Sequence, residues 1–209
     1  MQRTLRHASS GAIAVVVFLL SLAPVQAREP VKSLLEMRQE RVVIQEWDLS
    51  CGAAALTTVL NQQFGDRVSE KEIARALIAR KEYLENPNLV QIHQGFSLLD
   101  LKRVSETRGY VGKGYGKMSV NDLVERAPVI VPIIASGYNH FVIFRGLLRD
   151  RVLLADPAFG SYTMRIEKFE EAWIDYPSFG QVGFVVSARS GHTPRNGLVP
   201  RPHDFVTFR

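Results

Sequence analysis

This chain of 209 residues has a single cysteine, no long apolar segment and no strong excess of charge of either sign. One cysteine cannot form a disulfide within the chain. No Gly-x4-Gly-Lys-[Ser/Thr] motif occurs, which excludes a P-loop nucleotide site. The histidines lack a metal-ligand spacing such as His-x3-His, so no metal and no cofactor is expected. The formal net charge of +5 is spread along the chain, so no nucleic-acid partner is indicated.

The first 27 residues have the composition of an export signal. Two arginines precede a short apolar run at residues 12–23, and Val25-Gln-Ala27 is a small-x-small cleavage site. The run is shorter than the about 20 residues that a membrane-spanning helix needs. We therefore expect a signal peptide at residues 1–27, cleavage before Arg28, and a periplasmic protein without a stable transmembrane anchor. An uncleaved membrane anchor is the alternative.

The mature chain is long enough for one domain. Removal of residues 1–27 leaves 182 residues and lowers the formal net charge to +3. Residues 188–209 hold four arginines, two glycines and no apolar run before Phe205. We expect one domain at residues 28–187, followed by a loosely ordered C-terminal tail at residues 188–209.

Helix signals dominate the first half of the domain and strand signals the second. Ser69-Glu-Lys-Glu72 is a capping box before apolar residues at helical spacing, and Ser97 begins a further helix that ends at Gly109. A short strand is expected at residues 42–44. Further runs rich in β-branched and aromatic residues predict strands at residues 129–134, 140–144, 151–154, 161–166 and 182–186, with a helical piece at residues 167–173. This order predicts an α+β fold, a helical half packed on an antiparallel β-sheet.

The cysteine, Cys51, lies where an extended segment turns into a helix. Three alanines follow it, Gly65 is a natural stop, and Asp48 or Ser50 can cap the start. The thiol then lies in the first turn, where unpaired backbone N–H groups favour an anion and hence the reactive thiolate. A small buried core residue is the alternative. An unpaired cysteine in an exported protein is unusual, however, which favours a functional thiol.

A reactive thiolate needs a base, and the base needs a group that orients it. His140 opens a predicted strand, and Asp156 ends the next one. If these strands form a hairpin, both side chains come to the same end of the sheet, where the carboxylate can orient the imidazole toward a thiol. Taken singly, a strand-end histidine and a turn aspartate before proline are common structural features. His93 lies in a loop between helices, where a solvated role is expected.

In combination these segments resemble the C39 peptidases, papain-like cysteine proteases that occur as N-terminal domains of bacteriocin-exporting transporters. The resemblance covers about residues 40–187. It rests on Gln45-x5-Cys51-Gly, on the strand after His140, and on Asp156-Pro-Ala-Phe-Gly.

The resemblance implies a papain-like fold and a role for each matching residue. Cys51 would be the nucleophile, His140 the general base and then acid, Asp156 the group that orients the histidine, and Gln45 a donor to the oxyanion. One departure is Ser50, because the family usually has aspartate before the cysteine. The sequence is similar to stand-alone periplasmic members found with bacterial functional-amyloid export systems, which links it to biofilm.

The implied function is a periplasmic cysteine endopeptidase that cleaves an exported polypeptide, with secretion-system components as possible partners. Trp47 and Tyr138 lie just ahead of Cys51 and His140 and are expected to flank a narrow approach to the thiol. That approach would favour cleavage after a small residue such as Gly. Ordinary core packing of the two aromatic residues is the alternative.

Two other functions stay open. The first is a catalytically silent C39-like module that binds extended peptides as a chaperone or docking unit of a secretion system. The second is another thiol hydrolase on a papain-like scaffold, such as a cell-wall amidase or a transglutaminase. The intact set of Cys, His, Asp and Gln counts against the first, and the two motifs around Cys51 and Asp156 count against the second.

Overall fold

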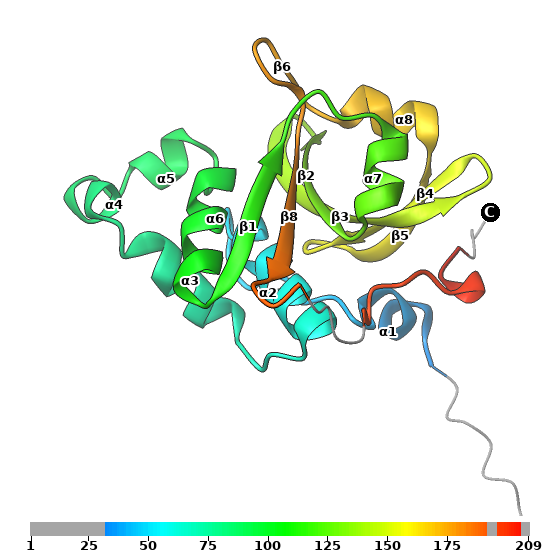
Figure 1. The fold of residues 1–209 in the computed structure, drawn as a ribbon, viewed down its shortest axis with the longest axis horizontal. Helices are drawn as coiled ribbons and strands as arrows, with labels where there is room; N and C mark the ends of the chain where they lie inside the picture. Colours follow the sequence, from blue (N-terminus) through cyan, green and yellow to red (C-terminus); the bar gives the residue numbers. More distant parts are fainter. Residues whose placement is uncertain (1–31, 192–195, 206–209) are drawn as a thin grey trace, which may run out of the picture. The chain divides into compact units, whose positions relative to one another are not determined.

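The computed structural model describes residues 32–191 and 196–205 (Figure 1). The expected signal peptide and its cleavage site lie outside these residues. In the described part of the chain, no helix is both long and apolar enough to cross a membrane.

Helices make up most of the first half of the described chain, as the capping motifs predict. Each of the predicted starts at Ser69 and Ser97 forms a capping box, in which the serine and an acidic residue three positions later cap each other's backbone. The helices are α1 (Leu34–Gln39), α2 (Cys51–Phe64), α3 (Glu70–Ile78), α4 (Lys81–Glu85), α5 (Leu89–Ile92), α6 (Leu98–Thr107), α7 (Val120–Arg126) and α8 (Ile166–Ala172).

The second half contributes most of a six-stranded sheet with the order β1-β8-β2-β3-β4-β5, in which every neighbouring pair is antiparallel. Its strands are β1 (Tyr110–Tyr115), β2 (Val129–Ala135), β3 (Tyr138–Leu148), β4 (Arg151–Asp156), β5 (Gly160–Arg165) and β8 (Gly183–Ala188). A small hairpin of β6 (Asp175–Tyr176) and β7 (Gly180–Gln181) lies outside this sheet. Helices packed on an antiparallel sheet confirm the predicted α+β class.

Helices cover both faces of the sheet (Figure 1). Ile130 of β2 packs into a core shared with α2, α3 and α6, whereas Val129 and Val131 pack into a second core with α7 and α8. Successive residues of a strand point to opposite faces, so burial on both sides requires the continuous apolar run that made β2 visible in the sequence. Within the first core, Ala53, Ala54 and Ala55 are fully buried, which lets α2 lie close to the sheet.

Two strand expectations differ from the structure. Residues 42–44 form no strand, because Val43 N donates to the side chain of Thr58 rather than to another strand. Conversely, β1 was not expected, since Gly112 and Gly114 have low strand propensity. Gly112 fits there because a Cβ atom at this position would lie 2.8 Å from the ring of Phe184 on β8.

Residues 196–205, which we call the C-terminal segment, lie against the domain. Leu198 is 1% exposed within the core, and its carbonyl accepts a hydrogen bond from the buried Arg145 side chain. Asp204 forms ion pairs with both Arg41 and Arg145. These contacts hold the described part of the segment against the domain, and the loosely ordered tail expected at residues 188–209 stays a prediction. The domain boundaries at 27/28 and 187/188 stay predictions.

Candidate active site

Cys51 is the first residue of α2 and is 5% exposed. Ser50 occupies the N-cap position, but its side chain does not cap the helix. Its hydroxyl instead lies within hydrogen-bond distance of Trp47 O and of Glu70 Oε1 on α3. The predicted helix start is therefore correct, whereas the predicted cap by Ser50 is not. The uncapped first turn leaves backbone N–H groups near the thiol.

His140 and Asp156 come together as the hairpin interpretation predicts. Strands β3 and β4 pair in antiparallel fashion, with Ile143 opposite Ala155, so the start of β3 lies beside the end of β4. His140 Nε2 lies 2.7 Å from Asp156 Oδ1. The same oxygen accepts a 2.7 Å hydrogen bond from Ala158 N, which fixes the carboxylate. Because β3 is an interior strand, His140 lies at the end of a strand and not on an edge strand of the sheet.

The Cys51 side chain also acts on the imidazole. Burial lowers the pKa of His140, but the hydrogen bond and charge of Asp156, together with the interaction with Cys51, outweigh it and raise the pKa to about 9. Since Nε2 is engaged by Asp156, Nδ1 is the nitrogen left for the thiol. The site thus favours an imidazolium between the Cys51 sulfur and the Asp156 carboxylate.

Tyr162 is a neighbour of this cluster that the sequence analysis missed. It pairs with Leu154 across β4 and β5, two positions from the Asp156–Gly160 pair, so it lies on the same face of the sheet as Asp156. Burial, followed by the charge of Asp156, raises the pKa of the Tyr162 phenol. The register of the β4–β5 hairpin was the signal that could have identified it.

Gln45 lies ahead of the same helix start. Its backbone N–H donates to Pro157 O at 2.8 Å, which links it to the loop after Asp156. Its side-chain Nε2 donates to Trp47 O at 3.0 Å. Its Oε1 is buried and has no hydrogen-bond partner within residues 32–191 and 196–205. The amide therefore has a fixed orientation, with one of its two N–H hydrogens used.

The two aromatic residues expected beside the site are exposed. Trp47 is 42% exposed and Tyr138 66% exposed, so neither is packed in the core. Trp47 lines a groove of about 330 Å³ with Ser50, next to Cys51, and with residues of α3 and α5. Tyr138 begins β3, two residues before His140.

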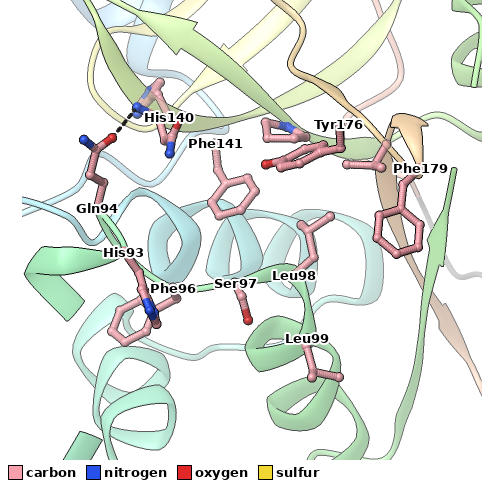
Figure 2. Close-up of a pocket in the computed structure, with 13 residues that line it drawn as sticks. His93, Gln94, Phe96, Ser97, Leu98, Leu99, His140, Phe141, Tyr176 and Phe179 are labelled. Carbon is pink, nitrogen blue, oxygen red and sulfur yellow. Dashed lines mark hydrogen bonds between the residues drawn. The ribbon is translucent and has the colours of Figure 1, made fainter. Parts of the chain in front are cut away.

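A mostly apolar cavity of about 420 Å³ adjoins His140 (Figure 2). Its side chains come from β2 and β3, from the start of α6 and the segment that leads into it, and from the region of the β6–β7 hairpin. Among the lining residues, the sequence analysis singled out only His140 as functional, with His93 as a solvated loop residue and Ser97 as a helix start, because the others are brought together by the fold. They are Gln94, Phe96, Leu98, Leu99, Pro132, Asn139, Phe141, Tyr176, Phe179 and Val182.

One polar contact bridges the two sides of this cavity. Asn139 N donates to Gln94 Oε1 at 3.1 Å, next to His140 (Figure 2). Across the described residues, no group of three or more His, Cys, Asp or Glu side chains is placed to hold a metal ion. The arrangement therefore offers nucleophilic and acid–base groups beside an apolar cavity.

Residues 39–177 match the model of the Peptidase C39 family. The chain belongs to this family. The match includes Gln45, Cys51, His140 and Asp156, and it confirms the resemblance drawn from the motifs around them.

Two curated C39 relatives are named "Probable functional amyloid protease FapD", one from Pseudomonas aeruginosa and one from Pseudomonas fluorescens. Each is 34% identical to this chain over 143 residues, which is 68% of this chain. The aligned region spans 61% of the length of each relative.

Solved C39 peptidase structures share the fold. A double glycine motif protease from an AMS/PCAT transporter, in complex with the leader peptide, has a TM-score of 0.54 at 21% identity, over 70% of this chain and 90% of that one. The peptidase domain of Streptococcus ComA, a bifunctional ABC transporter, has a TM-score of 0.55 at 19% identity, over 71% of this chain and 98% of that one. The papain-like architecture expected from the sequence is thus confirmed.

Proposed function

We propose that this C39 family member is a cysteine endopeptidase with Cys51 as nucleophile and His140 and Asp156 as its partners. The observation that carries the proposal is the 2.7 Å contact between His140 Nε2 and Asp156 Oδ1, with Cys51 acting on the same imidazole. A protein that only binds peptides would not need a cysteine, a histidine and an aspartate placed in this way. Peptidase function also agrees with the family and with the name of the Pseudomonas relatives.

The chemistry follows from the charges. The Cys51 thiolate attacks the scissile carbonyl carbon, and the protonated His140 gives its proton to the leaving amine nitrogen. A water molecule then attacks the thioester while His140 takes its proton, which regenerates the thiolate. Asp156 keeps the ring oriented throughout. The backbone N–H of Cys51 and the second N–H hydrogen of the Gln45 amide would stabilise the oxyanion, and one such donor contributes about 3 kcal/mol.

The substrate of this proposal is an extended segment of an exported polypeptide. The apolar cavity beside His140 would take an apolar side chain near the cleaved bond. Trp47 and Tyr138, both exposed, would narrow the approach to the thiol and favour a small residue such as Gly or Ala at the cut. The functional-amyloid name of the relatives makes an amyloid-forming polypeptide a suitable substrate, within a secretion or biofilm system.

The proposed location is the periplasm, because residues 1–27 have the composition of an export signal. Expression of the full chain, followed by intact-mass measurement of the periplasmic protein, tests it. We expect a species that begins at Arg28. A species that keeps residues 1–27 and sediments with membranes would mean an anchored enzyme instead.

Activity is tested by incubating the protein with a proteome-derived peptide library and identifying new ends by mass spectrometry. We expect cleavage by the wild type, none by Cys51→Ala or His140→Ala, and full activity of His203→Ala, a matched control because His203 lies far along the chain and is exposed. If the wild type cleaves nothing but retains peptides on a column, the alternative of a silent peptide-binding module replaces the peptidase.

A further inference from the structure

Glu70, at the first position of α3, is a buried carboxylate that the proposed mechanism does not use. It is 4% exposed. Glu70 Oε1 lies 2.5 Å from Ser50 Oγ, and Glu70 Oε2 accepts a 2.9 Å hydrogen bond from Glu46 N. A carboxylate is rarely buried unless its oxygens are engaged. Here both oxygens contact a single loop, the one that leads into Cys51.

The loop, residues 46–50, joins the two groups that the proposed mechanism assigns to the oxyanion. Glu46 directly follows Gln45, whose side chain is one donor, and Ser50 directly precedes Cys51, whose backbone N–H is the other. Glu70 therefore bridges the two ends of the loop. Its two contacts set the separation between the donors without touching either of them.

A second path of polar contacts leads from Glu70 to the amide of Gln45. Ser50 Oγ lies 2.7 Å from Trp47 O, and the same carbonyl accepts the Gln45 Nε2 hydrogen bond at 3.0 Å. The Ser50 hydroxyl has one hydrogen, which Glu70 Oε1 and Trp47 O share as acceptors. Loss of the Glu70 contact would leave that hydrogen to the Trp47 carbonyl alone and so alter the carbonyl on which the orientation of the amide depends.

The loop needs an external restraint because its backbone is strained. Leu49 has φ of 65°, in the left-handed region that non-glycine residues seldom adopt. The restraint itself is firm, since α3 is anchored in the core through Ile73 and Leu77, both fully buried. A rigid helix thus holds a strained loop by one carboxylate.

We propose that Glu70 is a positioning residue that holds the Gln45 amide and the Cys51 backbone N–H in register as an oxyanion site. The proposal rests on the proposed peptidase function. Because the oxyanion exists only after attack, loss of Glu70 lowers kcat and leaves substrate binding nearly unchanged. Removal of a whole oxyanion donor lowers kcat by roughly 100-fold or more. Glu70→Ala only misplaces the donors, so we expect kcat to fall by about 10- to 100-fold and KM to change by less than about threefold.

The kinetic test compares Glu70→Ala with Glu72→Ala, a matched control. Glu72 lies on the same helix, is exposed, and caps its start through Ser69, away from residues 46–50. We expect kcat to fall in the first variant only. Gln45→Ala combined with Glu70→Ala should lose less kcat than the product of the two single losses, because part of the effect of Glu70 acts through that amide. Equal losses in the two helix variants, or losses that multiply in the double variant, would mean a merely structural role.

A second readout needs no turnover. In wild-type protein, Glu70 protects the Glu46 amide hydrogen from exchange, and we expect NMR-detected exchange at Glu46 to accelerate at least about tenfold in Glu70→Ala, with the protection at Ile73 unchanged. Glu70→Gln, which keeps the size of the side chain, serves if the alanine variant fails to fold. Unchanged exchange at Glu46 overturns the positioning role. If exchange at Glu46 accelerates in Glu70→Ala but the wild-type protein cleaves no peptide, the contact between Glu70 and the loop is supported and the peptidase proposal is refuted.

Discussion

Asp156 and Asp204 each hold a basic side chain of β3, but the two partners differ in how readily they exchange a proton. Asp156 accepts a hydrogen bond from His140 at 2.7 Å beside the large apolar cavity. Asp204, from the C-terminal segment, accepts one from Arg145 at 2.9 Å and is also paired with Arg41. Both carboxylates are largely shielded from water, with side-chain exposures of 1% and 10%.

The partners decide what each network can do. Burial lowers the pKa of Arg145 to about 10, which still leaves the guanidinium protonated at neutral pH, so Asp204 can only hold its neighbours in place there. Histidine exchanges its proton readily, so Asp156 can support proton transfer. The same carboxylate chemistry therefore gives a structural clamp at one end of β3 and a candidate catalytic pair at the other. The predictions below separate the two.

The largest effects are expected for His140→Ala and Asp156→Ala, which disrupt the candidate catalytic pair. Loss of the orienting carboxylate should lower kcat by about 10⁴-fold, less than the about 10⁶-fold loss expected for His140→Ala, while the protein stays folded. A peptide-cleavage assay measures kcat, and circular dichroism checks that each variant is folded. Asp204→Asn is the control and should retain the kcat of the folded protein. Equal loss of activity in both variants would remove the distinction between the two networks.

Asp204→Asn should instead be the variant that unfolds easily. It leaves the buried Arg145 guanidinium, whose side chain is fully shielded, without its carboxylate. Breaking a buried pair by removal of one partner costs about 3–5 kcal/mol in the free energy of unfolding. Urea denaturation measures it, with Asp175→Asn on the exposed β6 as a matched aspartate variant that should change little. A stability equal to that of the wild type would mean that the C-terminal segment is not a clamp.

The two networks should weaken at opposite ends of the pH scale. Burial raises the pKa of Asp204, but the Arg201 backbone N–H and the Arg41 side chain outweigh it and lower the pKa overall. The contribution of Asp204 to the stability of the fold is therefore complete above the unfolded pKa of about 3.9 and is lost as the pH falls. The pKa of His140 is raised to about 9, so its stabilisation is complete below about 6.5 and lost as the pH rises through about 9.

NMR titration of the His140 ring checks the alkaline half of this expectation. The midpoint should lie near 9 in the wild type and fall in Cys51→Ala, because the hydrogen bond and charge of Cys51 contribute to the raised pKa. A His140 midpoint that Cys51→Ala leaves unchanged would show that the two side chains do not interact.

How much the sequence could predict differs between the same two regions. The candidate active site was predictable because motifs around Cys51, His140 and Asp156 combine with strand signals that place the last two at one end of a hairpin. The Asp204 clamp was not, since it joins residues 41, 145 and 204 across the fold, and its segment has no apolar run. The cavity beside His140 was missed for the same reason, because its residues come from four separate segments of the chain.

The smallest effect concerns selectivity rather than rate. Trp47→Ala and Tyr138→Ala should each relax the preference for a small residue at the cut, because both side chains are exposed beside the proposed approach to the thiol. Profiling of a peptide library before and after each change measures the shift. An unaltered preference in both variants would end the narrow-approach hypothesis while the peptidase proposal stands.

The most direct test of the central claim is to trap the covalent intermediate. The protein is mixed with an activated ester of a peptide that ends in Gly-Gly, quenched with acid within milliseconds to seconds, and measured by intact-mass spectrometry and peptide mapping. We expect one acyl group on Cys51 in the wild type, much slower acylation in His140→Ala, and none in Cys51→Ala. Acylation at the same rate in His140→Ala, or an acyl group on another residue, would contradict the proposed pair.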